Sequence, residues 1–191
     1  MTDLKAMLAA MTSTNAPTFR QIVHPHEITA ELRNELIDCW ITVTNAGGAA
    51  GFPFPPVGIE QVGPVADRLI ADLDPQRSRL LLAVVDGVLA GWLNLRRDLN
   101  PVVAHWGTVN HVQSHTDFRG RSIGTALMNR AREIARDEMN LEQLHLAARG
   151  GVGLEDFYGR LGWKEIGRWP GALRLAPDGD RDEVLMILAP L

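Results

Sequence analysis

The stretch Ser114–Met128, S-H-T-D-F-R-G-R-S-I-G-T-A-L-M, is the segment around which the predicted fold is organised. It follows a run of alternating apolar and polar residues, passes through an Arg/Gly turn, and continues with apolar residues three and four positions apart. This order is typical of a strand, a tight turn and a helix. Such a helix directs its unpaired backbone N–H groups and the positive end of its dipole into the turn. The stretch therefore predicts an anion site, most naturally for a phosphate.

Two common phosphate-binding patterns do not match this turn. The dinucleotide fingerprint requires G-x-G-x-x-G and the P-loop requires G-x-x-x-x-G-K-[ST]. The chain instead has Arg119–Gly124, R-G-R-S-I-G, at the start of the predicted helix. Six residues alone leave open the alternative of an ordinary strand-to-helix turn that binds nothing.

Length and composition indicate a single globular domain. The chain has 191 residues, 46% hydrophobic and 22% charged, which excludes disorder as a description of the whole. We expect residues 1–17 to form a flexible N-terminal arm and residues 18–191 to form a single domain. A net charge of −4 argues against a broad nucleic-acid-binding face.

The charge is unevenly distributed around the opening stretch. Five arginines and one acidic residue, Glu133, lie between Phe118 and Arg136. We assign a phosphate role to Arg119 and Arg121 only. The three later arginines fit a solvated helix face, which is the usual place for such charges.

The single cysteine and the apolar pattern indicate the compartment. Cys39 is the only cysteine, so no internal disulfide is possible. It lies among apolar residues and is expected to be a buried structural residue. No apolar run approaches the 18 residues of a membrane span, and residues 1–17 lack the features of a signal peptide. We therefore expect a cytoplasmic protein that does not bind membranes.

Periodicity and turn residues predict the order of the elements. The expected helices are His26–Asn45, Ile59–Leu73, Ser122–Asp137 and Leu154–Leu161. The expected strands are Thr18–Val23, Leu80–Val85, Val88–Leu95, Trp106–Ser114, Leu141–Ala148, Lys164–Trp169 and Glu183–Leu188. Asp86-Gly87 predicts a hairpin turn. Only the helix Ser122–Asp137 is expected to connect parallel neighbours.

Two motifs resemble those of a known superfamily. Arg119–Gly124 resembles the R/Q-x-x-G-x-G/A signature with which GNAT N-acetyltransferases hold the pyrophosphate of acetyl-CoA. Phe157–Trp163, F-Y-G-R-L-G-W, resembles the [FL]-Y-x-x-x-G-[FYW] motif of the same superfamily. Both motifs occur in the expected order. From about Thr18 onward the resemblance implies an α/β (α+β) GNAT fold, a three-layer sandwich with a mixed, mostly antiparallel twisted sheet of six to seven strands flanked by helices.

The resemblance also implies which residues bind acetyl-CoA. The pyrophosphate would lie on the turn and the start of the helix, and the acetyl and pantetheine parts would lie along the preceding strand. The implied cofactor-binding residues are Val112, Gln113, Ser114, Arg119, Gly120, Arg121, Ser122, Ile123, Gly124 and Thr125. Ser122 departs from the signature because it replaces the first glycine, although its hydroxyl can donate to a phosphate oxygen. Gly150-Gly151 also depart, at a position where many members have a cofactor-binding asparagine.

Acetyl transfer to an amine needs a base and an acid. The resemblance implies that Tyr158 protonates the departing thiolate, with anchoring of its helix as the alternative. Many members have a glutamate base where this chain has Thr108 or Asn110. Allowing one inserted residue, the resemblance puts His145 where other members have a catalytic glutamate on the next strand, so we expect His145 to be the base. His111 is the second candidate, because it lies on the opposite face unless a bulge re-aims it. A water chain is the remaining alternative.

Three histidines on one predicted strand raise the question of a metal site. His105, His111 and His115 share the same strand parity. At about 3.3 Å per residue the outer two are roughly 30 Å apart, too far for one ion. We therefore predict no metal site.

These expectations combine into a predicted function. We expect an N-acetyltransferase that moves an acetyl group from acetyl-CoA directly to a primary amine of a small molecule. Features such as Gly47-Gly48 and Pro170-Gly171 resemble the tabtoxin-resistance type, which implies an amino-acid-like toxin as acceptor. The loop Gly47–Pro56 and Trp106 are expected to shape the acceptor pocket. The alternatives are a non-catalytic acyl-CoA-binding or sensing module and a protein lysine or N-terminal acetyltransferase. The superfamily also suggests a homodimer.

Overall fold

The computed structural model describes residues 16–48, 51–52 and 54–191, so nearly all of the predicted arm, residues 1–17, lies outside it. Among these residues the strands are β1 (Thr18–Ile22), β2 (Ser78–Val85), β3 (Val88–Arg97), β4 (Trp106–Ser114), β5 (Gln143–Arg149), β6 (Lys164–Arg174) and β7 (Asp180–Leu188). The helices are α2 (Ala30–Asn45), α3 (Ile59–Ala71), α4 (Ile123–Glu133) and α5 (Leu154–Arg160). Short helical segments are η1 (Pro25–Glu27), η2 (Thr116–Phe118) and η3 (Ile134–Glu138).

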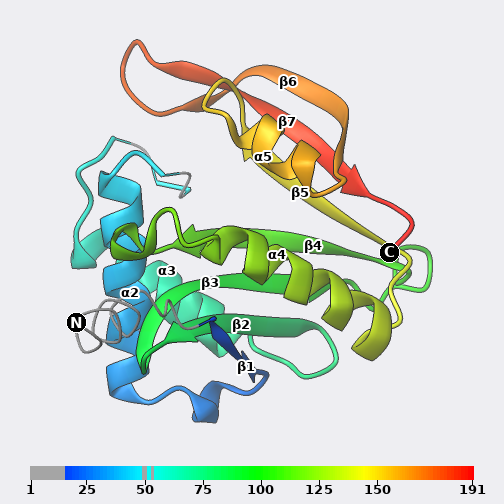
Figure 1. Ribbon diagram of the computed structural model, residues 1–191. Helices are drawn as coiled ribbons and strands as arrows, with labels where there is room; N and C mark the ends of the chain where they lie inside the picture. Colours follow the sequence, from blue (N-terminus) through cyan, green and yellow to red (C-terminus); the bar gives the residue numbers. More distant parts are fainter. Residues whose placement is uncertain (1–15, 49–50, 53) are drawn as a thin grey trace, which may run out of the picture.

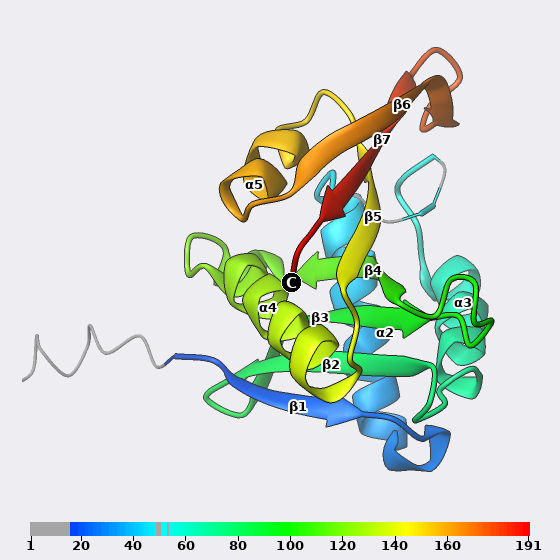
Figure 2. The same cartoon turned by 90° about the vertical axis from the view of Figure 1, so that its right-hand side faces the viewer.

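The strands form one sheet in the order β1-β2-β3-β4-β5-β7-β6. Every neighbouring pair is antiparallel except β4 and β5, which are parallel and connected through α4. Figure 2 shows α4 on one side of the sheet and α2 and α3 on the other. The predicted fold, a mixed and mostly antiparallel sheet flanked by helices, is therefore confirmed, and so is the single parallel crossover.

Two hydrophobic cores lie on the two sides of the sheet. Successive side chains of a strand point to opposite faces, so Trp92 packs in the core with Trp40 of α2 while Leu93 packs in the core with Leu127 of α4. Trp92 and Leu93 are each no more than 1% exposed. The predicted burial of Cys39 is confirmed, and this burial raises the pKa of its thiol to about 12.

The hairpin of β6 and β7 is longer than the sequence predicts. The strand predicted over Lys164–Trp169 continues to Arg174 as β6, and the strand predicted over Glu183–Leu188 begins earlier, at Asp180, as β7. The pairing of β6 with β7 is irregular between Trp169 and Leu173. β6 is an edge strand, where an irregular pairing and a proline are tolerated. The predicted ends of these two strands were therefore wrong.

The sheet divides into two arms at β4 and β5. These strands pair only at Trp106↔Gln143, Gly107↔Leu144 and Thr108↔His145. Beyond Thr108 the strands diverge, and Figure 1 shows β5 to β7 separating from β1 to β4. Within the part of the chain that the structure describes, no helix combines the length and apolar character needed to cross a bilayer.

Candidate active site

The divergence of β4 and β5 leaves backbone groups without strand partners. β4 pairs with β3 from Gly107 to Ser114 but with β5 only as far as Thr108. Beyond Thr108, the N–H and C=O groups on the β5 side of β4 therefore face the split between the strands. A free strand edge of this kind binds extended ligands through main-chain hydrogen bonds. The segment Val112–Ser114 lies on this edge.

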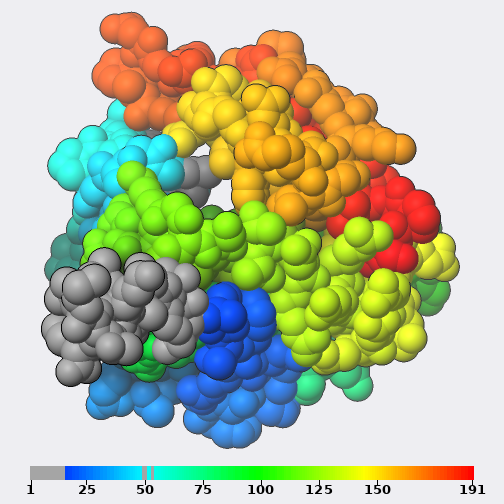
Figure 3. All heavy atoms as spheres, viewed as in Figure 1, coloured from blue at the N-terminus to red at the C-terminus, as the bar shows by residue number. Residues whose placement is uncertain are grey.

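A cavity of about 440 Å³ lies in the split. Figure 3 shows the surface hollowed between the green residues at the start of α4 and the yellow residues around α5. The lining residues are Gly51, Phe52, Val109, Asn110, His111, Val112, Leu146, Ala147, Ala148, Arg149, Leu154, Tyr158, Ala172, Leu173, Arg174, Leu175 and Glu183.

Side chains from both sides of the sheet line the cavity. Leu146 and Tyr158 line it and belong to the core on the α4 side. His111 and Phe52 also line it, and their rings contact Trp40 of α2 on the other side. A ligand approaching past α4 and α5 can therefore meet a second ligand approaching past α2.

A β-bulge turns His111 toward the α2 side. Trp92 pairs with Gln113 and Asn94 pairs with Asn110, so two residues of β4 lie opposite the single residue Leu93. His111 has φ 54°, a left-handed conformation that is uncommon for a residue with a side chain but less so for histidine. Its ring lies 4.8 Å from that of Trp40, centroid to centroid. The bulge is the feature that the sequence analysis left open.

The surroundings of His111 favour its neutral form. Burial lowers the pKa of the imidazole below its usual 6.5, and the positive charge of Arg96 lowers it further. Neither ring nitrogen hydrogen-bonds to a residue that the structure describes. At neutral pH the ring is therefore uncharged and has a nitrogen free to accept a proton.

His145, the other candidate base, lies outside the cavity lining. It pairs with Thr108 at the last contact between β4 and β5, and its ring stacks on Trp106 with centroids 4.5 Å apart. Burial, followed by the charge of His105, lowers its pKa, and its Nε2 is buried without a described partner. The structure brings His111 and Tyr158 to one cavity but not His145. Trp106, expected in the acceptor pocket, also lies outside the lining, whereas Phe52 is part of it.

Tyr158 projects from α5 into the cavity. Its side chain is 7% exposed, and its ring contacts those of Phe157 and Trp163. Burial raises the pKa of the phenol to about 12, so the hydroxyl is protonated at neutral pH. This hydroxyl has no hydrogen-bond partner among residues 16–48, 51–52 and 54–191. It can therefore donate a hydrogen bond to a ligand in the split.

The turn before α4 offers unpaired N–H groups. The first hydrogen bond of the helix runs from the N–H of Ala126 to the carbonyl of Ser122, at 2.9 Å. The N–H groups of Ile123, Gly124 and Thr125 precede it and have no described acceptor. No acidic residue lies in the first turn of α4. This end of the helix therefore suits an anion.

Ser122 occupies the N-cap with φ 57° and ψ 25°. Glycine is favoured in this left-handed region because it has no Cβ, which gives a physical reason for the glycine of the signature. The Ser122 side chain is exposed and makes no capping hydrogen bond, so its hydroxyl is free to meet a phosphate. A Cβ on Gly124 would lie 3.3 Å from the Phe157 ring. Gly124 thus allows α4 to approach the helix that carries Tyr158.

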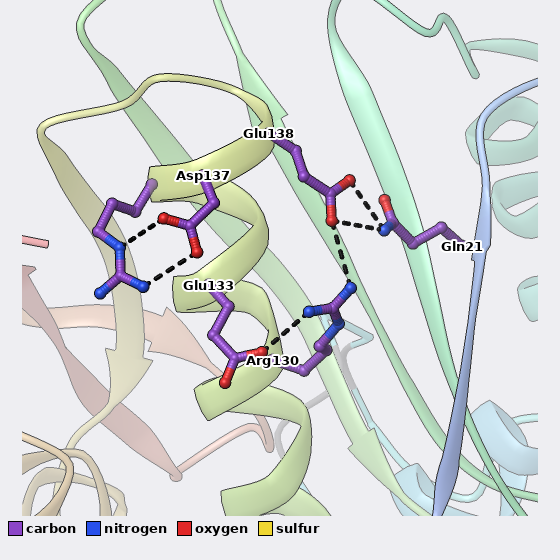
Figure 4. A network of polar contacts seen from close by, with 6 residues as sticks. Gln21, Arg130, Glu133, Asp137 and Glu138 are labelled. Carbon is purple, nitrogen blue, oxygen red and sulfur yellow. Dashed lines mark hydrogen bonds and ion pairs between the residues drawn. The ribbon is translucent and has the colours of Figure 1, made fainter.

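The arginines near the turn differ from those farther along the helix. Arg119 and Arg121 form no ion pair within the described residues, and Arg121 lies over the Phe118 ring at 5.2 Å. Arg130, in contrast, binds Glu133 at 2.9 Å and Glu138 at 3.2 Å. Figure 4 shows this network, in which Glu138 also accepts from Gln21 of β1. Arg136 forms a separate ion pair with Asp137. The two turn arginines are therefore available to a phosphate.

One predicted residue, Gln113, can offer only its backbone to a ligand, and some lining residues were missed. The Gln113 side chain is 0% exposed and absent from the lining, so only its main chain can face the cavity. Arg149 and the segment Ala172–Leu175 were not predicted to line a site. Arg149 continues the alternation of the predicted strand by one residue, which is a signal for it. Among the described residues no group of three or more His, Cys, Asp or Glu side chains gathers as a metal site.

Comparisons with known proteins are consistent with this geometry. Over 72 residues the chain is 39% identical to a mycothiol acetyltransferase of Mycolicibacterium vanbaalenii, a match that covers 37% of this chain and 22% of that protein. The chain thus covers about a fifth of that curated relative.

Two solved structures are similar. A GCN5-related N-acetyltransferase from Kribbella flavida has a TM-score of 0.71 at 22% identity, covering 92% of this chain and 98% of that one. A nourseothricin acetyltransferase has a TM-score of 0.52 at 28% identity, covering 62% of this chain and 68% of that one. The family model "Acetyltransferase (GNAT) family" matches residues 29–163. Since this match spans more than half of the chain, the protein belongs to the acetyltransferase (GNAT) family, whose members use acetyl-CoA.

Proposed function

We propose that this protein transfers an acetyl group from acetyl-CoA to a primary amine of a small molecule. The observation that carries the proposal is the cavity in the β4–β5 split, which Tyr158 lines from the α4 side and His111 from the α2 side. Family membership supports acetyl transfer. Of the similar proteins, the mycothiol and nourseothricin acetyltransferases are not named for protein substrates.

The turn and the free edge of β4 would hold acetyl-CoA. The N–H groups of Ile123, Gly124 and Thr125, with Arg119 and Arg121, would bind its phosphates. The unpaired edge of β4 at Val112–Ser114 would bind the pantetheine through main-chain hydrogen bonds. An N–H group of this edge would also donate to the carbonyl oxygen, which becomes negatively charged during attack. Acetyl-CoA supplies the activated acetyl group as a thioester.

His111 and Tyr158 would move the protons. An alkyl amine is mostly protonated at neutral pH, with a pKa of about 10, and only its neutral form attacks a carbonyl. His111, uncharged at this pH, would accept the proton directly or through water. The Tyr158 hydroxyl, whose pKa is raised to about 12 and which is therefore protonated at neutral pH, would donate its proton to the sulfur as the C–S bond breaks.

A thiol-release assay with acetyl-CoA tests the proposal. The amines would include amino acids, amino-acid toxins, polyamines, aminoglycosides and peptides, and calorimetric titration would measure CoA binding separately. We expect thiol release with at least one small amine and little release with peptides. CoA binding without release by any amine would instead indicate a sensing module. Release confined to peptides would indicate a protein acetyltransferase.

Two expectations accompany this function. We propose a cytoplasmic location, where acetyl-CoA is available, and a homodimer. Fractionation of the cells that produce the protein tests the location. Sedimentation velocity tests the homodimer, and a monomer at micromolar concentration contradicts it.

A further inference from the structure

Arg149 is a charged residue in the cavity that the chemistry of acetyl transfer does not use. It is the last residue of β5 and lines the cavity. Its Nη2 donates a hydrogen bond to the carbonyl oxygen of Gly47, just beyond the end of α2. The guanidinium therefore lies on the α2 side of the split, the side to which the His111 ring is turned.

The charge of Arg149 has no partner within the described residues. No carboxylate lies within ion-pair distance, and the buried Nε has no hydrogen-bond acceptor. Glu183 pairs with Arg149 across the strands and lines the same cavity, yet the two form no ion pair. Burial lowers the pKa of Arg149, and the positive charge of Arg181 lowers it further, as expected for an uncompensated cation.

Two neighbouring arginines, Arg168 and Arg174, have carboxylate partners. Arg168 pairs with Glu165 at 2.9 Å and with Asp182 at 3.2 Å. Arg174, which also lines the cavity, pairs with Asp180 at 2.8 Å. A purely structural link from Arg149 to Gly47 uses one of five N–H donors. A partly buried guanidinium left otherwise unsatisfied is costly, which favours a ligand as the missing partner.

We propose that Arg149 binds a carboxylate of the acceptor, so that the enzyme selects amines that also carry a carboxylate, as amino acids do. The planar guanidinium matches a carboxylate in a two-point hydrogen bond. The acceptor would place its amine at His111 and its carboxylate at Arg149, which lie on the same side of the split. This inference rests on the proposed acetyl transfer and adds the chemical class of the acceptor.

Matched pairs of amines test the inference. Each pair consists of an amino acid and its decarboxylated form, for example lysine with 1,5-diaminopentane and phenylalanine with phenethylamine. We expect kcat/KM for thiol release to be about 10- to 100-fold higher for the amino acid, the range of a charged hydrogen bond. Arg149→Gln should bring kcat/KM for the amino acid down to that of its partner, and Arg149→Lys should keep part of the preference.

Arg181→Gln is the matched control. It removes an equal charge that acts on Arg149 electrostatically but belongs to a residue outside the cavity lining. This variant should keep the wild-type preference. A loss of preference in Arg181→Gln equal to that in Arg149→Gln would mean that general positive charge, not Arg149, selects the acceptor, and would overturn the inference.

Calorimetric binding of the same pairs, with CoA present, separates this inference from the proposed function. If the amino acids bind through Arg149 but no amine releases thiol, the inference stands and acetyl transfer fails. If both members of each pair react and bind equally, or if Arg149→Gln keeps the preference, the carboxylate is not recognised and the inference is wrong.

Discussion

The two arms of the sheet differ in how completely they are covered. In β3, every residue from Leu89 to Leu95 is buried, because α4 packs on one side and α2 on the other. In β6, every residue except Gly167 and Leu173 is exposed. The central strand β3 is therefore covered on both faces, while the edge strand β6 lies outside the cores and contributes Ala172, Leu173 and Arg174 to one wall of the cavity. The candidate active site lies between these two regions, where the pairing of β4 with β5 stops.

Truncation of matched apolar residues in the two arms should give the largest difference. Leu93 is 0% exposed and Ile166 is 57% exposed. Leu93→Ala should lower the free energy of unfolding by about 2–5 kcal/mol through lost burial and a cavity, and Ile166→Ala by about 0.5 kcal/mol or less. Urea denaturation measures both. Equal losses would mean that Ile166 of β6 is packed as tightly as Leu93 of β3.

The strand bounds were also predicted better in the buried region around β3 than in the exposed edge strand β6. The β2–β3 hairpin was predicted because its strands are continuous apolar runs around Asp86-Gly87, whose φ values of 52° and 81° fit a hairpin turn. The β6–β7 hairpin was predicted too short, because β6 has an exposed edge and an irregular pairing instead of an apolar pattern. An alternating pattern of apolar residues reflects burial of one face of a strand. Most residues of β6 are exposed, so its sequence carries no such pattern.

Parts of the candidate site can be predicted from sequence where a local motif marks them. Tyr158 and the turn before α4 carry such motifs. The bulge at His111 depends on the pairing of β4 with β3, and the position of Arg149 beside Gly47 depends on where β5 lies relative to α2. Neither relation is encoded in the spacing of nearby residues. Sequence reasoning therefore placed His145 before His111, and the structure brings only His111 to the cavity.

The pH dependence of the rate should separate the two histidines. Below the lowered pKa of His111, which lies under 6.5, the ring becomes protonated and cannot accept a proton, so kcat/KM should fall as the pH falls through that value. His111→Gln should lower kcat/KM by about 10²-fold and remove this acidic limb. His145→Gln is the matched comparison and should change the rate less. A larger effect of His145→Gln would identify His145 as the base and exclude the role assigned to the bulge.

The smallest expected effect is at the junction between β4 and α4. Ser122 has a left-handed conformation and makes no capping hydrogen bond. Ser122→Gly should raise the free energy of unfolding by up to about 1 kcal/mol, because glycine adopts φ above zero without strain. Thermal unfolding measures the change, with Ser114→Gly in β4 as a control that should be destabilising. A lower free energy of unfolding in Ser122→Gly would show that the serine side chain stabilises the fold by more than its left-handed backbone conformation destabilises it.

The rate of thiol release by Tyr158→Phe tests most directly whether transfer occurs in the split between the arms. The hydroxyl lines the cavity and has no hydrogen-bond partner among the described residues, so its removal should leave the fold and CoA binding intact. With the best amine of the panel, kcat should fall by about 10²-fold or more, while the Kd for CoA stays within about twofold of wild type. An unchanged kcat in a folded, CoA-binding Tyr158→Phe protein would contradict the account.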